Sequence, residues 1–280
     1  MKPSPLVYVR PKTVTEAVGL LSEVEWGARV IAGGQSLVPM LNLRLAPLIK
    51  LVDISRIEEL RTAQDDGDSV TYGACLRHGE FEDATVPDAT NGFMQRVASR
   101  IAYRAIRNRG TIGGSVCLAD PSADWIAALM ALDAEYRIVG PDGTHSVETA
   151  DMFIGPYTTA IGDHDILSAI TVRKLSSRAR TGYYKIIRKA GEYPMTTAAV
   201  VRDPNLGLSN IVLGVANRPQ IRLAASSNLL KQDPQWSEST RGAFLAAFHQ
   251  DMAGADRAGD PEELKLSETT VLRAVQRALE

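Results

Sequence analysis

Two pairs of adjacent glycines are the residues of this sequence whose type and spacing suggest chemistry. Gly33–Gly34 follows an apolar run and is followed by Ser36, and Gly113–Gly114 follows a shorter apolar run and is followed by Ser115. Glycine has no Cβ and adopts positive φ at little cost, so such a pair can bring several backbone N–H groups together around an anion. A serine hydroxyl can add a hydrogen bond or cap the next helix. The pattern is typical of phosphate-binding turns.

Three other kinds of glycine-containing turn could have this composition. A P-loop requires the pattern GxxxxGK[ST] and a Rossmann dinucleotide site requires GxGxxG, and neither pattern occurs in this sequence. A tight turn without any ligand is the third alternative, and it is the commoner reason for one isolated glycine pair. Because the two segments have the same form, VIAGGQSL and TIGGSVCL, we favour two turns that share the diphosphate of one dinucleotide.

The composition limits the class of protein. The 280 residues are 45% hydrophobic, and 31 basic residues stand against 33 acidic ones for a formal charge of −2, which allows two or three packed subdomains and argues against a nucleic-acid partner. Cys75 and Cys117 are too few for a disulfide framework or an iron–sulfur cluster, and the four histidines lack metal-ligand spacing. With no signal peptide or membrane-length apolar segment, we expect a cytoplasmic protein without a metal of its own.

Helical and strand patterns alternate in the first part of the chain. Thr13 is a suitable N-cap for a helix that extends to about Val24, and the run 28–34 predicts a short buried strand. The segment 37–46 predicts a short helix or turn, with Pro39 in its first turn, and 48–54 a second strand. These elements predict a small βαβ-like unit that ends near residue 55.

The rest of the chain predicts two further regions. In the middle region we expect strands at 70–76, 135–140, 145–153 and 166–174, and helices at 78–84, 91–108 and 125–134. After residue 176 we expect strands at 181–189, 195–203 and 208–222, and helices around 240–252 and 267–280. The predicted organisation is therefore a first subdomain at 1–55, a second at 56–176 and a C-terminal α+β domain at 177–280.

Two longer segments carry a family resemblance. AGGQSLVPMLNLRLA, residues 32–46, and RNRGTIGGSVCLADPSADW, residues 107–125, resemble the two FAD-binding signatures of the flavin subunits of molybdenum-containing hydroxylases. That family includes the medium subunit of carbon monoxide dehydrogenase and the flavin domain of xanthine dehydrogenase. The resemblance continues in order through DGTHSVETADMFIGPYTT, DILSAITV and YYKIIRKAGEYPMTTAAVV. It therefore covers most of the chain.

The resemblance implies a fold and a set of cofactor-binding residues. The implied fold is α+β, of the vanillyl-alcohol-oxidase-like (PCMH) type, with two α/β subdomains that enclose FAD and a C-terminal α+β domain. The pyrophosphate would be wrapped, largely through main-chain N–H groups, by the two glycine segments. The residues implied to bind FAD are Ala32, Gly33, Gly34, Gln35, Ser36, Leu37, Ile101, Thr111, Gly113, Gly114, Ser115, Asp124, Leu167, Lys185 and Tyr193.

The residues outside the glycine segments could also have purely structural roles. By resemblance, Asp124 would accept hydrogen bonds from the ribityl or neighbouring hydroxyls, but it could instead cap the helix near residue 125. Ile101, Leu167 and Lys185 correspond to contacts with adenine or the flavin ring. The first two would be buried in almost any fold, and the lysine could be a solvated edge residue. Tyr193 would lie near the isoalloxazine, or pack in a turn beside a proline.

Two positions depart from the family pattern, and three arginines remain open. Gln35 stands where relatives often have His or Thr, and Ser115 where they often have Asn or Asp; both are polar, so we expect FAD binding to persist. Arg104, Arg107 and Arg109 could approach phosphates or form a solvated helix face.

The resemblance implies an electron-transfer subunit with no catalytic residue of its own. A molybdopterin-containing large subunit would oxidise the substrate, an iron–sulfur small subunit would relay electrons, and the FAD of this chain would pass them to an external acceptor, in a dimer of heterotrimers. A self-contained FAD oxidase or dehydrogenase is an alternative, but no candidate base is evident. A cofactor-free binding module is the other alternative. The substrate would be selected in a partner chain, and a nicotinamide, a quinone, a cytochrome and oxygen remain alternatives for the final acceptor.

Overall fold

The computed structural model describes residues 3–232 and 238–280, and the chain divides into two compact units. Unit 1 consists of Met1–Pro87, Tyr103–Ala119 and Ala134–Arg173. Unit 2 consists of Asp88–Ala102, Asp120–Asp133 and Lys174–Glu280. Both units are discontinuous in sequence, so the structure groups the chain by contacts between distant segments. The division into subdomains 1–55 and 56–176 and a C-terminal domain 177–280 stays a prediction.

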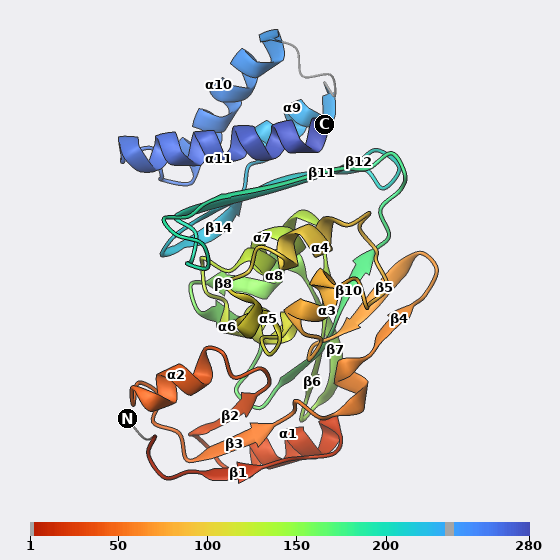
Figure 1. Cartoon of the computed structure of the whole chain (residues 1–280), viewed down its shortest axis with the longest axis vertical. Helices are drawn as coiled ribbons and strands as arrows, with labels where there is room; N and C mark the ends of the chain where they lie inside the picture. Colours follow the sequence, from red (N-terminus) through yellow and green to blue (C-terminus); the bar gives the residue numbers. More distant parts are fainter. Residues whose placement is uncertain (1–2, 233–237) are drawn as a thin grey trace. The chain divides into compact units, whose positions relative to one another are not determined.

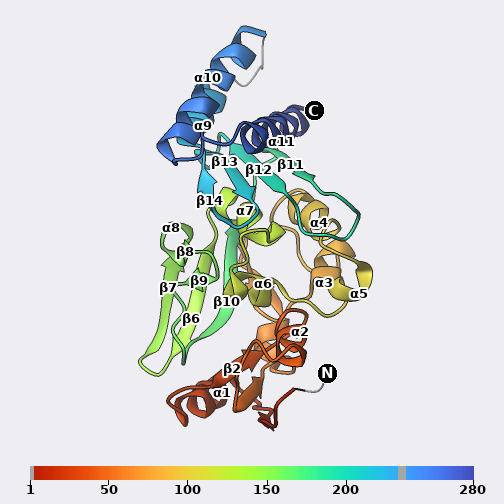
Figure 2. The same ribbon diagram turned by 90° about the vertical axis from the view of Figure 1, so that its left-hand side faces the viewer.

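Unit 1 contains three sheets. A parallel sheet has the order β1-β3-β2, an antiparallel sheet the order β4-β5-β10-β6-β7, and β8 pairs only with β9. The strands are β1 (Val7–Val9), β2 (Ala28–Ile31), β3 (Lys50–Asp53), β4 (Ala63–Asp65), β5 (Ser69–Gly73), β6 (Glu135–Gly140), β7 (Gly143–Glu148), β8 (Phe153–Gly155), β9 (Thr158–Thr159) and β10 (Ile166–Arg173). Figure 2 shows β6, β7 and β10 side by side.

The helices of unit 1 are short. They are α1 (Val14–Ser22), α2 (Leu37–Asn42), the 3-10 helix η1 (Glu58–Arg61), α3 (His78–Glu82), α5 (Arg104–Arg107), α6 (Ile112–Leu118) and α8 (Thr149–Met152). The predicted N-cap of the first helix is confirmed, because the Thr13 hydroxyl accepts a hydrogen bond of 3.1 Å from the amide of Glu16.

One face of α1 forms the centre of the unit 1 core. Its buried residues are Val14, Ala17, Val18 and Leu21, and this i, i+3, i+4, i+7 spacing places them on one side of a helix. They pack with buried residues of β3, β10 and the segment after β3, namely Val52, Ile54, Ile57, Leu60 and Ile166. This packing holds the parallel sheet against the antiparallel one and fixes the carboxyl ends of β1, β2 and β3.

Unit 2 is built on one antiparallel sheet with the order β11-β12-β13-β14. Its elements are α4 (Phe93–Ala98), α7 (Asp124–Ala131), β11 (Arg180–Ile186), β12 (Thr196–Asp203), β13 (Leu208–Val215), β14 (Arg218–Arg222), α9 (Ala224–Gln232), α10 (Glu238–Gly254) and α11 (Pro261–Leu279). Figure 1 shows α7 on one face of this sheet and α11 on the other. Seven of the eight residues of β12 are buried, because helices cover both faces.

The helix predicted over 91–108 is wrong as a single element. The chain forms α4 and α5, and the residues between them are not helical, with Ala102 at φ +39°. In unit 2 the Lys185 ammonium donates a hydrogen bond of 2.7 Å to the carbonyl oxygen of Arg100. A continuous helix would have used that carbonyl for the amide four residues later. A tertiary contact has therefore replaced helical continuation.

Two predicted strands also end earlier than expected. The strand predicted at 145–153 ends at Glu148, and α8 follows, where the Thr149 hydroxyl donates to the carbonyl oxygen of Ala134 at 2.5 Å. The run 208–222 folds as a hairpin of β13 and β14, because Asn217 adopts a left-handed φ of +63° between them. Among the described residues, no helix is long and apolar enough to cross a membrane.

Candidate functional site

The first glycine turn leaves β2 at the carboxyl end of the parallel sheet. Gly34 has a positive φ of +71°, the conformation that favours glycine. Among the described residues, the amides of Gly33, Gly34, Gln35 and Ser36 have no hydrogen-bond acceptor, and the Gln35 side chain folds back to donate to the carbonyl oxygen of Gly33 at 3.2 Å. Four successive free amides form a group of donors suited to an anion.

The helix that follows this turn is only partly as predicted. Ser36 occupies the N-cap position of α2, but its hydroxyl makes no capping hydrogen bond, so the predicted capping role is wrong. Its backbone is in the right-handed helical region, with φ −108° and ψ −48°, whereas a capping serine ordinarily has extended backbone. Pro39 lies in the first turn of α2, as predicted.

The two glycine segments lie against each other within unit 1. A Cβ built on Gly33 would overlap the carbonyl oxygen of Arg109 and lie 2.8 Å from the Cα of Gly110. Since real Cβ atoms do not approach so closely, only glycine allows the first turn to pack on the backbone that leads into the second segment. Residues far apart in the sequence therefore contribute to one surface.

The second glycine segment has a different conformation from the first. It forms the beginning of α6, where the Thr111 hydroxyl caps the helix by accepting the amide of Gly114 at 3.1 Å. The amides of Ile112 and Gly113 donate to the carbonyl oxygens of Leu76 and Ala74 at the end of β5, each at 2.9 Å. The amide of Ser115 also donates within the chain. Only the amide of Thr111 in this segment is without an acceptor among the described residues.

Gly113 is required for contact with β5 rather than for a free turn. A Cβ at this position would lie 2.5 Å from the Cβ of Ala74 and 2.6 Å from its carbonyl oxygen. The close approach lets α6 start directly on the strand end. The two glycine segments have similar sequences but different roles. The first supplies free backbone amides, and the second anchors the start of α6 beside them.

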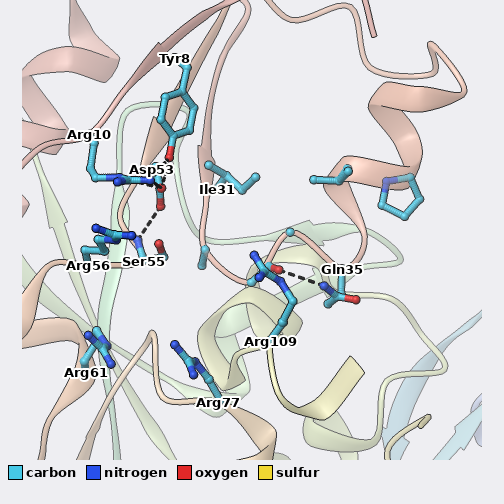
Figure 3. Close-up of a pocket in the computed structure, with 15 residues that line it drawn as sticks. Tyr8, Arg10, Ile31, Gln35, Asp53, Ser55, Arg56, Arg61, Arg77 and Arg109 are labelled. Atoms are coloured by element: carbon cyan, nitrogen blue, oxygen red, sulfur yellow. Dashed lines mark hydrogen bonds and ion pairs between the residues drawn. The ribbon is translucent and has the colours of Figure 1, made fainter. Parts of the chain in front are cut away.

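A pocket of about 1000 Å³ opens next to the first turn (Figure 3). It is lined by Ala32–Gln35, by Val38 and Pro39 of α2, and by five arginines with a single carboxylate, that of Asp53. The arginines are Arg10, Arg56, Arg61, Arg77 and Arg109. The concentration of positive charge beside four free amides is suited to a phosphate-containing ligand.

The single carboxylate of the pocket is held by its neighbours. Asp53 lies at the end of β3 and accepts hydrogen bonds from the Tyr8 hydroxyl, from the Arg10 guanidinium at 3.2 Å and from the Ser55 amide at 2.9 Å. Burial raises the pKa of Asp53, but the hydrogen bonds from Ser55, Tyr8 and Arg10 outweigh burial and lower it. This carboxylate therefore stays ionised and neutralises one of the five arginines.

Asp124 and Lys185 lie together in unit 2. The Lys185 ammonium contacts a carboxylate oxygen of Asp124 at 2.6 Å, both side chains are buried, and the Tyr183 hydroxyl donates to the same oxygen. Burial and the charge of Asp124 raise the pKa of Tyr183 well above its usual value. Asp124 is the first residue of α7 and makes no capping bond, so the helix-cap alternative is wrong. Lys185 is not the solvated edge lysine of the other alternative.

The remaining residues implied by resemblance have varied environments. Leu167 is buried in β10 of unit 1, and Leu37 begins α2 half-buried. In unit 2, Ile101 is half-buried after α4, whereas Tyr193 is 60% exposed. Whether these residues contact FAD stays a prediction.

Comparison with known proteins decides the family. Residues 3–173 match the family described as the FAD binding domain in molybdopterin dehydrogenase. The chain belongs to this family. It is 31% identical over 286 residues to the carbon monoxide dehydrogenase medium chain of Afipia carboxidovorans, with 99% of this chain and 98% of that chain covered. The corresponding chain of Hydrogenophaga pseudoflava is 34% identical over 218 residues, with 78% and 76% covered.

A solved structure agrees with the family. Carbon monoxide dehydrogenase from Hydrogenophaga pseudoflava, in a form that lacks the Mo-pyranopterin moiety of its cofactor, matches with a TM-score of 0.89 at 31% identity, covering 99% of this chain and 98% of that one. The predicted resemblance and the mixed α/β fold are thereby confirmed. The chain is an FAD-binding medium subunit of the molybdenum hydroxylase and dehydrogenase class, as predicted.

Sequence reasoning missed most of the pocket of this FAD-binding domain. Of the three arginines predicted as phosphate candidates, only Arg109 lines the pocket, while Arg104 and Arg107 form ion pairs of 2.7 Å with Glu82. The other four pocket arginines come from separate segments, and no spacing in the sequence connects them. Arg56 and Arg77 follow the predicted strands 48–54 and 70–76, and the carboxyl ends of strands often carry ligand-binding residues. Arg10 and Arg61 have no such signal.

Proposed function

We propose that this chain binds FAD through the turn Gly33–Ser36 and passes electrons from an iron–sulfur partner subunit to an external acceptor. The observation that supports the proposal is the set of four free backbone amides beside an arginine-rich pocket, in a chain whose family is defined by FAD binding. A dinucleotide diphosphate is the part of FAD that such donors fit.

The residues present fit the cofactor at its phosphate end. The turn offers amides at successive positions, Gly33 has no Cβ, and Gly34 adopts the left-handed conformation that points such amides to one side. The pocket of about 1000 Å³ has room for more than a diphosphate. When bound, FAD supplies the redox chemistry that no side chain of this chain provides.

The work of the protein in this proposal is binding and electrostatics. The amides of Gly33–Ser36 hold the diphosphate, and Thr111 contributes its one free amide and fixes the start of α6. Arg109, which lies against the first turn, adds positive charge at the same place. No proton transfer by a side chain is required, so the proposal includes no catalytic residue.

The buried group in unit 2 has a positioning role in this proposal. Asp124, Lys185 and Tyr183 share hydrogen bonds, and together they attach the start of α7 to β11. We propose that this group orients nearby main chain for FAD, while Ile101, Leu167, Leu37 and Tyr193 contribute apolar or aromatic contacts. Gly113, Gly114 and Ser115 then act by fixing α6.

The partners in this proposal follow the family. An iron–sulfur small subunit would deliver electrons and a molybdopterin large subunit would oxidise the substrate, in a dimer of heterotrimers located in the cytoplasm. The three-part organisation, with FAD between the segments 1–55 and 56–176, belongs to the same proposal. Copurification from the native host should recover two other chains in equal amounts with this one, and recovery of this chain alone with full dehydrogenase activity would contradict the proposal.

The experiment for FAD binding compares substitutions at two glycines whose positive φ disfavours alanine to a similar extent. Gly34 and Gly67 both have positive φ, +71° and +89°, but only Gly34 lines the pocket. The full chain is mixed with FAD, and binding is followed by flavin fluorescence. We expect wild type and Gly67→Ala to bind FAD, and Gly34→Ala to bind at least about tenfold more weakly, the equivalent of one lost charge-assisted hydrogen bond.

Two outcomes would contradict the proposed site. Equal FAD affinity of Gly34→Ala and Gly67→Ala would show that FAD does not bind at the turn Gly33–Ser36. Equal affinity of the wild-type chain for FMN and FAD would mean that the diphosphate is not recognised, because FMN has only one phosphate. A chain that takes up no flavin would favour the cofactor-free alternative.

A further inference from the structure

Four arginines of the pocket form a group without counter-ions. They are Arg56, Arg61, Arg77 and Arg109, and they come from the segment after β3, the end of η1, the start of α3 and the segment before α6. In the part of the chain that the structure describes, none of their guanidinium groups has an ion pair or hydrogen bond. Arg10, in the same pocket, is paired with Asp53. We call the four the arginine cluster.

The side chains of the arginine cluster line one pocket. Figure 3 shows Arg56 beside Ser55, Arg61 and Arg77 next to each other in the lower part of the view, and Arg109 apart from them near Gln35. Like charges that share one pocket repel each other, and an anion between them removes this repulsion. By contrast, Arg29, Arg104 and Arg107 of unit 1 each form an ion pair with an acidic side chain.

The charge of the pocket exceeds what one diphosphate neutralises. Five arginines and one aspartate leave a surplus of four positive charges. A dinucleotide diphosphate carries about one negative charge on each of its two phosphates. About half of the surplus therefore remains when FAD is bound as proposed above, and the pocket volume of about 1000 Å³ leaves room for a further group.

The arginine cluster has two ends. Arg109 lies at the glycine turn, because Gly33 packs on its backbone. Arg56 and Arg61 follow β3, the other strand of the parallel pair, beyond Asp53, whose register partner is Ile31 of β2. Arg77 is the N-cap residue of α3, and its backbone forms an isolated β-bridge with Thr111. Arg56 and Arg61 therefore place part of the surplus charge at the β3 end of the pocket.

We propose that Arg56, Arg61 and Arg77 form a second oxyanion subsite, which binds one phosphate group while FAD occupies the glycine turn. This inference rests on the proposed FAD site. Planar guanidinium forks each match two oxygens of a phosphate, and three forks from three elements suit a tetrahedral dianion better than a flat carboxylate. The phosphate comes either from free orthophosphate or from a phosphate monoester.

The test uses the full chain loaded with FAD. Orthophosphate, and separately ribose 5-phosphate, is titrated calorimetrically at constant ionic strength while the flavin absorbance is recorded. We expect one anion per chain to bind without release of FAD, and the tighter of the two ligands identifies the source of the phosphate. The double variant Arg56→Gln/Arg61→Gln should weaken anion binding at least about tenfold, because the anion loses hydrogen bonds from two charged donors.

The control removes the same charge from the same unit. Arg137 and Arg173 are exposed on β6 and β10 and lie outside the pocket, so Arg137→Gln/Arg173→Gln should bind the anion within about twofold of wild type. An equal loss in both double variants would overturn the subsite, as would stoichiometric displacement of FAD by phosphate. A chain that binds phosphate through Arg56 and Arg61 but takes up no FAD would support an anion site and contradict the proposed function.

Discussion

Gly33 packs on the backbone of Arg109, with no space for a Cβ between the two segments. This contact joins the end of β2 to the segment that leads into α6, and it brings the free amides of the first turn next to the only arginine that the glycine segments themselves supply to the pocket. The geometry of the FAD site therefore depends on the absence of one side chain.

We expect Gly33→Ala to separate the two segments. The added methyl would meet the Arg109 carbonyl oxygen and the Gly110 Cα, so one segment must move, and FAD affinity should fall at least about tenfold. The matched control is Gly19→Ala, since a Cβ at Gly19 in α1 meets nothing within 4 Å. The control should bind FAD normally and gain about 0.5 to 1 kcal/mol of stability. Flavin fluorescence titration measures the affinities, and equal values would contradict the packing.

The buried pair Asp124–Lys185 predicts strongly unequal effects of single and double substitution. Lys185→Met leaves a buried carboxylate without its counter-ion, and the free energy of unfolding should fall by about 3 to 5 kcal/mol. The double variant Asp124→Leu/Lys185→Met leaves no unpaired charge and should be more stable than Lys185→Met alone. Urea denaturation of the three proteins measures the differences. A double variant no more stable than Lys185→Met would contradict a coupled ion pair.

His78 predicts acid sensitivity of unit 1. Burial, and to a smaller extent the charge of Arg107, lowers the pKa of His78 from 6.5 to about 3. Below pH 6.5 the imidazole of His78 therefore binds a proton in the unfolded chain but not in the folded chain. Its contribution to stability is complete above pH 6.5 and is lost as the pH falls toward about 3, at up to about 1.4 kcal/mol per pH unit.

The prediction for His78 is checked by comparing how steeply the unfolding free energy depends on pH in two proteins. Urea denaturation of wild type and His78→Gln is compared at several pH values from 7 down to about 4.5, above general acid denaturation. The variant should show a shallower dependence of the unfolding free energy on pH, whatever its stability at pH 7. Parallel curves would show that this histidine does not titrate as its burial requires.

Tyr183 should resist ionisation in the folded chain. Burial and the neighbouring Asp124 carboxylate raise its pKa well above the usual 10. At about pH 11, where exposed tyrosines have lost their protons, wild type and Tyr183→Phe should therefore give the same tyrosinate absorbance while folded. In denaturant, wild type should show the signal of one more tyrosinate. A difference already present in the folded proteins would mean that Tyr183 is accessible to solvent.

Local patterns correctly predicted several elements. The Thr13 cap and the apolar spacing of α1 are properties of adjacent residues, and β6 has the bounds predicted for 135–140. The prediction of one helix over 91–108 was wrong because no residue type in this segment indicates a break. The carbonyl of Arg100 is instead taken by Lys185, a residue that local sequence cannot bring near.

The sequence by itself determined that both turns contain glycine pairs and that the segments of the chain follow those of the flavin subunits. These are consequences of residue type and order. Three features were decided by the tertiary structure alone. The amides of the second glycine segment donate to carbonyl oxygens just after β5, Asp124 pairs with Lys185, and arginines from separate segments line one pocket. Each of these depends on which distant segments pack together, and no property of neighbouring residues specifies that.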